Sequence, residues 1–188
     1  MNTHILIMKA GPYCGFSLDE IIKIKQQEEK DCGVFYWGYG GVFCRPQTIN
    51  AFVSHAKSHQ QSPTGMFSIT KSAYATLSGT KFTHFSLDNS NWNPLPQQVL
   101  LVGNKTVSHY AIVGKNLKAK KIDLNLSDYC NFAGIFPDEN RYLDSYFQYR
   151  VDKACGYYLP RPHAKGKIIV VDYTFDLVDP YSIYVKSF

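Results

Sequence analysis

The sequence lacks any long apolar run. Its most apolar stretches, such as 98–103 and 167–171, are far shorter than the roughly 20 residues that a membrane-spanning helix needs. The first four residues, Met-Asn-Thr-His, show no cationic segment ahead of an apolar one, so no secretory signal peptide is expected. We therefore expect no membrane partner and a cytoplasmic location.

Cysteine is scarce, and its spacing offers neither a disulfide framework nor a zinc site. The five cysteines include no Cys-x-x-Cys pair; they are Cys14, Cys32, Cys44, Cys130 and Cys155. This usage is typical of reduced thiols in a cytosolic protein. No cofactor is expected.

Carboxylates are almost absent from the middle of the chain. Residues 32–122 hold nine lysine or arginine residues and one acid, Asp88, which gives this stretch a formal charge of +8. A region of this charge attracts anions and repels cations. It predicts an anionic partner, although a scatter of surface lysines would give the same count.

The composition is that of a folded protein. The chain has 188 residues, of which 45% are hydrophobic and 19% are charged, so a disordered chain is excluded and a single globular domain, 1–188, is expected. Lysine far exceeds arginine, and tyrosine and phenylalanine together supply 26 residues. These residues have AT-rich codons, an association that favours a bacterial or phage source.

The clearest local signal is a helix that begins at Ser17. Ser17 and Glu20 have the spacing of a capping box. The helix is expected to run to about Asp31, where Gly33 suits its C-terminal end. We expect it to cover one face of a sheet.

Strands are expected around this helix, at 4–9, 34–37 and 65–70. A second helix is expected to begin near Pro46, which a first helical turn tolerates. Its apolar residues recur at helical spacing: Ile49, Phe52, Val53 and Ala56. The resulting β-α-β-α-β order predicts a partly parallel sheet covered by helices.

The remainder predicts an antiparallel meander with strands at 98–102, 107–113 and 119–124. Gly114–Asn116 is expected to supply one of its turns. Asp138–Ala154 has the periodicity of a third helix, and 167–175 and 181–185 are expected to form a closing hairpin around Asp179 and Pro180. The fold class is therefore mixed α/β (α+β).

The segment from Phe35 to Pro46 has the layout strand, glycine loop, helix start. Glycines let the backbone approach a ligand closely, the first turn of a helix favours an anion, and a guanidinium can bind phosphate through two hydrogen bonds. We expect Gly40 or Gly41 to adopt a backbone conformation that other residues rarely take. The spacing fits neither a dinucleotide fingerprint nor a Walker loop. The candidate ligand-binding residues are Trp37 and Tyr39, which could stack on a base, and Gly38, Gly40, Gly41 and Arg45. The alternative is a tight turn that only allows the strand and helix to pack.

Two histidines lie on expected strands within the basic region. His84 is followed by Phe85 and Ser86, and His109 by Tyr110 and Ala111. Two such histidines facing one cleft could act as acid and base on a phosphodiester without a metal. A class of metal-independent phosphoesterases uses paired His-x-Ser/Thr motifs on strands, and only the first tripeptide fits that pattern. The candidate catalytic residues are His84, His109 and Ser86.

The sequence predicts no metal site. His55 and His59 are four residues apart and would share a helix face, but the adjoining glutamate of an H-E-x-x-H motif is missing. Three tyrosines, Tyr142, Tyr146 and Tyr149, would form a stripe on the third helix. Such a stripe suits a ligand wall or the interface of a homo-oligomer.

Three functions follow from these patterns. The leading hypothesis is binding or sequestration of a phosphorylated small molecule, namely a nucleotide or signalling nucleotide, at Gly38–Arg45. The second is a metal-independent phosphodiesterase that uses His84 and His109. The third is nucleic-acid binding by the lysine-rich meander, which would weaken steeply with salt.

Overall fold

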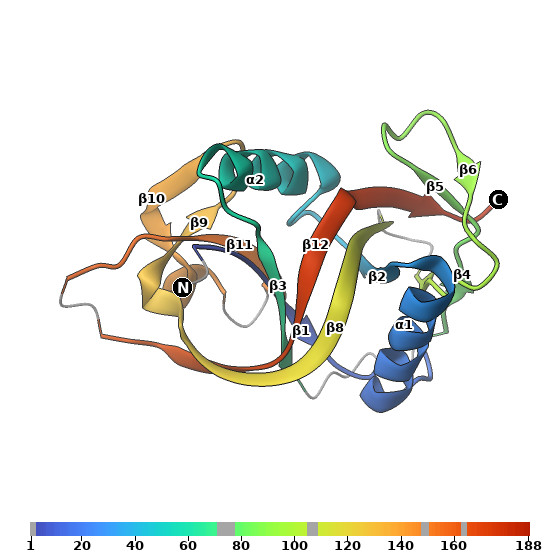
Figure 1. Cartoon of the computed structure of the whole chain (residues 1–188), viewed down its shortest axis with the longest axis horizontal. Coiled ribbons are helices and arrows are strands. Elements are labelled where there is room, and N and C mark those ends of the chain that lie inside the picture. Colours follow the sequence, from blue (N-terminus) through green and yellow to red (C-terminus); the bar gives the residue numbers. More distant parts are fainter. Residues whose placement is uncertain (1–2, 71–77, 105–108, 148–150, 163–164) are drawn as a thin grey trace. The chain divides into compact units, whose positions relative to one another are not determined.

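The structure is a computed structural model that describes residues 3–70, 78–104, 109–147, 151–162 and 165–188. The protein is mixed α+β, with about 21% helix and 48% strand; the described residues form a curled sheet and three helices (Figure 1). This confirms the predicted fold class. Within these residues, none of the helices combines the length and the apolar character that crossing a membrane requires.

The chain divides into two compact units, and each is built from three separate segments. Unit 1 contains Met1–Lys9, Phe43–Ile69 and Lys118–Asp176; unit 2 contains Ala10–Val42, Thr70–Leu117 and Leu177–Phe188. Two long strands, β8 (His109–Asn125) and β12 (Ile168–Lys186), contribute one part to each unit. The single domain expected from the sequence stays a prediction.

The strands of unit 1 follow one another in the order β10 (Pro137–Tyr142), β9 (Tyr129–Phe132), β11 (Lys153–Tyr158), β1 (His4–Ala10), β3 (Thr64–Ile69) and β12. β11 pairs antiparallel with both β1 and β9, so that His4 lies opposite Tyr157 and Tyr157 lies opposite Cys130. Residues directly opposite each other point to the same face of a sheet. These three side chains therefore share one face.

Helix α2 (Pro46–Ser58) covers that face (Figure 1). Its buried residues include Ile49, Phe52, Val53 and Ala56, which confirms the predicted helix and its apolar side. The Phe52 ring lies 5.7 Å from that of His4 and 5.6 Å from that of Phe132, centroid to centroid. An apolar core forms elsewhere in the unit from Ile5, Ile7, Met66, Leu124, Leu126, Tyr129, Leu143, Phe147, Ala154 and Val171.

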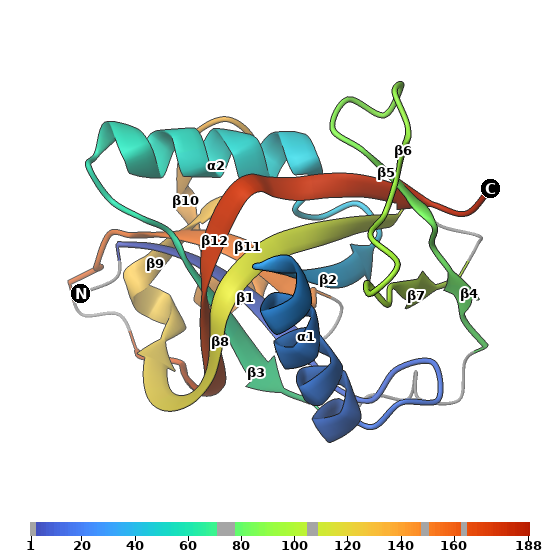
Figure 2. The same ribbon diagram turned by 45° about the vertical axis from the view of Figure 1, so that its right-hand side comes forward.

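Unit 2 is built around the antiparallel pair of β2 (Phe35–Gly40) and the first part of β8. Helix α1 (Leu18–Cys32) packs with β2 (Figure 2). The unit also contains β5 (His84–Ser86), which pairs with the last part of β12 and with β6 (Asn93–Pro94), and the pair β4 (Thr80–Lys81) and β7 (Val102–Gly103). Its core contains Phe82, Leu95, Val99, Leu101, Ala111, Val113, Ile183 and Val185.

Both predicted ends of α1 are confirmed. The Ser17 hydroxyl accepts a hydrogen bond from the backbone N–H of Glu20 at 3.3 Å, and the Ser17 N–H donates to the Glu20 carboxylate at 2.7 Å. Gly33 adopts φ +77° and donates its N–H to the carbonyl of Glu29. This reciprocal capping satisfies backbone groups that the helix itself leaves without partners.

The predicted third helix over Asp138–Ala154 is wrong. Its first residues belong to β10, a single helical turn, α3, spans Leu143–Tyr146, and its last residues begin β11. Tyr142 therefore closes a strand while Tyr146 lies in the short helix, and Tyr149 lies outside the described residues. Pairing of β11 with β1 and β9 overrides the local helical spacing, so Tyr142 and Tyr146 do not share the face of one long helix.

Two predicted turns are also wrong. Gly114–Asn116 lies within the long strand β8, where Gly114 pairs with Phe35 and the Asn116 N–H donates to Glu29. β12 likewise continues through Asp179 and Pro180, which are joined by a cis peptide bond. The second and third strands of the expected meander are therefore one strand, β8, which pairs with β2 and β12, while of the first only Val102 lies in a strand, β7. The expected closing hairpin is one strand, β12, whose two ends pair with β3 and β5. β2 pairs antiparallel with β8 in the same sheet that contains β1.

Candidate functional sites

The predicted glycine loop has the backbone that the sequence indicated. Gly41 adopts φ +92°, a left-handed conformation that residues with a side chain rarely take, which confirms the expectation for Gly40 or Gly41. A Cβ atom on Gly41 would meet nothing within 4 Å, so the conformation and not the space requires glycine. Arg45 is exposed at the start of α2. The chain passes from unit 2 to unit 1 between Val42 and Phe43, so the glycines belong to one unit and Arg45 to the other.

The two aromatic residues of this segment are core residues. Trp37 and Tyr39 are each only 8% exposed, and the Tyr39 hydroxyl is hydrogen-bonded to that of Ser182 at 2.9 Å. The Tyr39 ring also packs against Tyr110. Because their faces are covered, the expected stacking of a base on these rings is not supported. Gly38, between them, is exposed.

The predicted catalytic histidines each have their own neighbours in unit 2. His84 contacts Thr83 and the ring of Phe188, whereas His109 contacts the carbonyl of Asn104 and the ring of Phe82. Among the described residues, no hydrogen bond or ring contact joins the two histidines. Ser86 is fully buried and donates its hydroxyl to Asp88. The role of His84, His109 and Ser86 as an acid–base site therefore stays a prediction.

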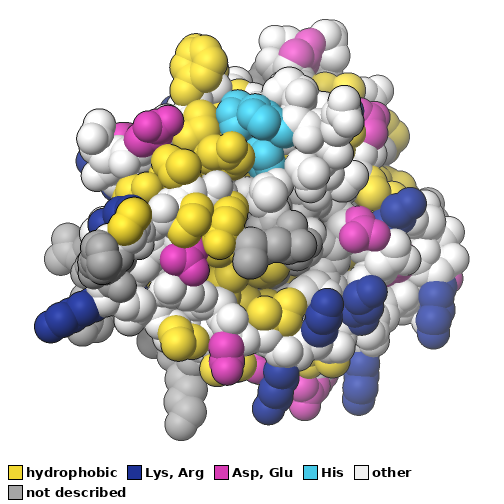
Figure 3. Space-filling model, turned by 60° about the vertical axis from the view of Figure 1, so that its left-hand side comes forward, with side chains coloured by type: hydrophobic (Ala, Val, Ile, Leu, Met, Phe, Trp, Pro, Cys, Tyr) yellow, Lys and Arg dark blue, Asp and Glu magenta, His cyan; other side chains and the backbone are white. Residues whose placement is uncertain are grey.

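A different histidine cluster forms in unit 1. His55 and His59 lie one turn apart at the C-terminal end of α2, with ring centroids 4.4 Å apart, as their spacing predicts. His4, the first residue of β1, joins them, and its Nε2 lies 2.8 Å from Nδ1 of His55. One nitrogen from each ring lies within 4.8 Å of the others. Histidine side chains appear together beside apolar ones on the face shown in Figure 3.

The environment of His4 and His55 favours uncharged imidazoles. Burial, with smaller contributions from the charges of His55 and His59, lowers the pKa of His4 to about 4. Burial also lowers the pKa of His55, with a smaller contribution from His59. His4 is buried, His55 is half-buried and His59 is exposed, so the cluster runs from the protein interior to solvent. Neutral imidazoles keep a lone pair for a proton or a metal ion.

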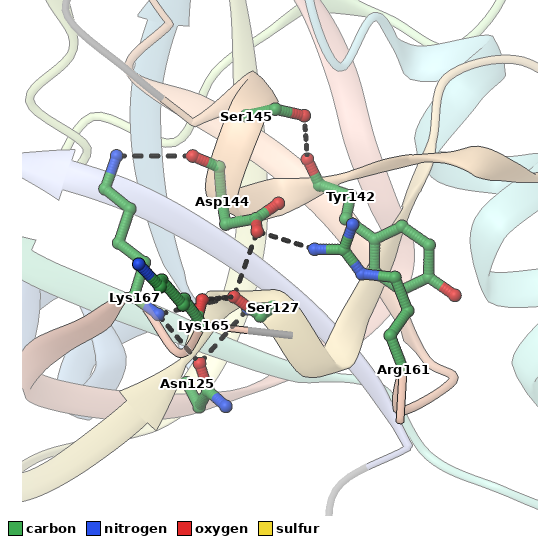
Figure 4. A network of polar contacts seen from close by, with 8 residues as sticks. All are labelled: Asn125, Ser127, Tyr142, Asp144, Ser145, Arg161, Lys165 and Lys167. Atoms are coloured by element: carbon green, nitrogen blue, oxygen red, sulfur yellow. Dashed lines mark hydrogen bonds and ion pairs between the residues drawn. The ribbon is translucent and has the colours of Figure 1, made fainter. Parts of the chain in front are cut away.

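A second polar network in unit 1 is centred on Asp144 (Figure 4). Its carboxylate accepts hydrogen bonds from the guanidinium of Arg161 at 2.6 Å and from the Ser127 hydroxyl at 3.0 Å. The Arg161 guanidinium also lies over the Tyr142 ring, 3.9 Å from its centroid. Backbone bonds of Lys167 to Asn125 and Ser127 complete the network. These contacts hold the segment before β12 in position. The Arg161 guanidinium is already bound to protein groups, so it is a poor candidate for ligand binding.

Comparison of the chain with protein-family models, with curated proteins and with solved structures gives no match. Of the residues in the histidine cluster, the sequence pattern indicated only the helical pair. His4 carries no local signal, because it reaches the pair through the packing of β1 against α2.

Proposed function

We propose that the protein binds a phosphorylated small molecule, in the first instance a nucleotide, at the start of α2. The observation that carries the proposal is the way this helix begins: Arg45 is its N-cap, provides no side-chain cap, and is exposed. Pro46 opens the first turn, and that turn contains no acidic residue. The positive end of the helix is therefore left without a carboxylate from its own first turn.

The chemistry of phosphate suits such a helix start. Backbone N–H groups of a first turn point along the helix axis, and the helix dipole favours negative charge there. The Arg45 guanidinium can add two parallel hydrogen bonds to phosphate oxygens. Each charge-assisted bond contributes about 1.5–3 kcal/mol net. That Gly38, Gly40 and Gly41 also contribute to ligand binding stays a prediction.

The basic middle of the sequence supports the same class of ligand. Residues 32–122 carry a formal charge of +8, so anionic small molecules are attracted and cationic ones are repelled. We propose binding without turnover, which for a bacterial or phage protein in the cytosol would amount to sequestration of a signalling nucleotide. The homo-oligomer also stays a prediction.

The test is a thermal-shift screen of mono-, di- and cyclic nucleotides, followed by calorimetric titration of those that raise the melting temperature. Arg45→Ala should weaken binding by roughly 10- to 100-fold and leave the fold intact, since Arg45 is exposed. Lys57→Ala, an exposed change of equal charge near the other end of α2, is the matched control. Unchanged affinity in folded Arg45→Ala contradicts the proposal. Chromatography of the ligand separates binding from hydrolysis.

Nucleic-acid binding is the second candidate function, and one observation favours it. Lys118, Lys120 and Lys121 are all exposed within a four-residue stretch of β8. Exposed lysines bind phosphates without reading sequence, so affinity should fall steeply as salt rises. Replacing all three by glutamine should weaken binding equally for all sequences. A salt-independent affinity would exclude this function.

A further inference from the structure

We propose that His4, His55 and His59 form a binding site for one divalent transition-metal ion, with Zn²⁺ as its representative. The cluster joins residues 51 positions apart in sequence and places one nitrogen of each ring within 4.8 Å of the other two. It lies wholly within unit 1. The proposal is independent of phosphate binding at the start of α2.

The hydrogen bonds of the cluster determine which nitrogens can bind a metal. Nδ1 of His59 lies 2.8 Å from the carbonyl oxygen of His55, and because a carbonyl only accepts, this nitrogen carries the proton. Nε2 of His59 is therefore left with a lone pair. A metal-binding histidine with its other N–H on a carbonyl is the usual arrangement in metal sites.

His4 has a comparable partner on its far side. Its Nδ1 lies 3.0 Å from the hydroxyl of Thr3, which can accept a hydrogen bond from it. With the proton on Nδ1, Nε2 of His4 carries a lone pair toward His55. The proton in the hydrogen bond between the two rings then belongs to Nδ1 of His55. For this nitrogen to bind a metal, the proton must move to Nε2 of His55, which is a change of tautomer.

The distances require a small adjustment. Zn–N bonds of 2.0–2.1 Å in a tetrahedral site place ligand nitrogens about 3.4 Å apart. The hydrogen-bonded nitrogens of His4 and His55 are closer, at 2.8 Å, and would separate by about 0.6 Å. His59 is exposed in the last turn of the helix, so its ring can rotate inward without displacing the core.

The surroundings hold the ligands and select the metal. The Tyr157 ring lies 5.0, 5.2 and 5.8 Å from the rings of His4, His55 and His59. Phe52 packs on His4 and Phe132 packs on His55, so aromatic rings back the cluster. A set of three imidazoles, with no carboxylate or thiolate within it, suits Zn²⁺, Cu²⁺, Ni²⁺ or Co²⁺ better than Mg²⁺ or Ca²⁺.

Three neutral ligands leave the ion with its double charge and one open position. Three protein ligands with a fourth position for water or an anion are typical of zinc sites that are open to solvent. The exposed side of His59 is where that position would lie. A closed structural site would instead have four protein ligands.

The experiment uses the full chain, produced without a histidine tag and freed of metal with a chelator. Calorimetric titration with ZnCl₂ should give one ion per chain, and CoCl₂ should give the intense visible absorption of tetrahedral Co²⁺. His59→Gln and His55→Gln should each weaken zinc binding by more than the roughly 10- to 100-fold that is typical when a residue hydrogen-bonded to a metal ligand is replaced. Thr3→Val replaces such a residue, so its loss of zinc affinity should fall within that roughly 10- to 100-fold range.

The controls separate this site from general binding by surface histidines. His84→Gln, which changes a histidine of unit 2, should retain full affinity and stoichiometry. His59→Gln should melt like the wild type, because the residue is exposed. No binding by the wild type, or equal binding by the wild type and both cluster variants, would overturn the proposal and leave a hydrogen-bonded histidine stack.

Discussion

Among the described residues, each unit contains a cluster of titratable side chains that reaches into its interior, and these two clusters differ in how their polar atoms are used. In unit 2, Lys25 and Glu28 of α1 form a buried ion pair with Nζ and Oε1 2.6 Å apart. In unit 1, one hydrogen bond joins the rings of His4 and His55, and the outer nitrogens of His4 and His59 lie beside the Thr3 hydroxyl and the His55 carbonyl. Backbone groups fix the positions of Lys25 and Glu28, whereas the imidazoles can release their hydrogen bonds and bind a ligand instead.

The ion pair of unit 2 fastens α1 to the rest of the unit. Glu28 accepts the N–H of Leu100 at 2.9 Å and that of Tyr36 at 3.1 Å, while Lys25 donates to the Leu100 carbonyl at 2.7 Å. Burial lowers the pKa of Lys25, and Glu28 opposes that effect. Because these atoms are already committed to the protein, the cluster has a structural role. A cluster with spare lone pairs, such as the histidines, is the better candidate for a ligand.

The largest expected effect comes from breaking the ion pair. Glu28→Gln should destabilise the protein by about 3–5 kcal/mol, since it leaves the buried Lys25 ammonium without its counter-charge. The amide would also keep only one acceptor oxygen, so its NH2 group would face the N–H of either Leu100 or Tyr36. Urea unfolding of the variant and the wild type measures the difference.

Asp31→Asn is the matched control, because it removes a carboxylate from the exposed side of the same helix. Its cost should stay within about 0.5 kcal/mol. Equal losses in the two variants would show that Glu28 contributes no more than a surface charge, and the contrast between the two clusters would then fail.

The histidine cluster should instead reveal itself through pH. The pKa of His4 is about 4 in the folded protein and 6.5 for an unperturbed histidine, as in the unfolded chain. As the pH falls, His4 therefore takes up a proton in the unfolded chain before it does so in the folded protein. The stability contributed by neutral His4 is complete above pH 6.5 and is lost between about 6.5 and 4. The total loss is about 3 kcal/mol. The titratable groups facing His4 are His55 and His59 from α2 and Tyr157 from β11.

Unfolding free energies of the wild type and His4→Gln, measured in urea from pH 7 to pH 4.5, test this prediction. Carboxylates titrate in both proteins, so the difference between the two curves isolates His4. The wild type should lose its advantage as the pH falls. Two parallel curves would mean that His4 keeps an ordinary pKa.

How far the sequence could predict these regions depends on whether the signal is local. The capping box at Ser17 and the apolar spacing of α2 are local, and both helices form as expected. The strands β8 and β12 have turn-like residues in their interiors, and only pairing partners far along the chain keep them extended. The prediction of a third helix failed for the same reason.

The candidate site residues also differ in whether their signal in the sequence is local. The left-handed Gly41 follows from its place in a glycine-rich break and was predicted. The burial of Trp37 and the arrival of His4 beside His55 depend on tertiary packing, which no spacing in the sequence encodes. From the sequence alone, Lys25 and Glu28 have the pattern of surface residues on an amphipathic helix. Their burial depends on packing against the backbone of Leu100, which is distant in sequence.

A smaller effect is expected when α1 is weakened without touching the ion pair. Ser17→Ala removes the hydroxyl that caps the helix and should cost about 1 kcal/mol. Ser17→Asp keeps an acceptor at the same position and should restore most of the loss. Thermal melts of both variants measure this. A loss as large as that of Glu28→Gln would mean that the cap, and not the ion pair, holds the helix.

The smallest expected change in stability is at His59. The residue is exposed, so His59→Ala should alter the free energy of unfolding by no more than about 0.5 kcal/mol in metal-free buffer. In ZnCl₂ at 100 times the dissociation constant, the wild type should gain about 2.7 kcal/mol, whereas the variant should gain nothing at the same concentration. Paired urea titrations with and without the metal measure both effects. An equal gain in the variant would place any bound zinc elsewhere, and a large loss without metal would make the cluster structural, like the ion pair of unit 2.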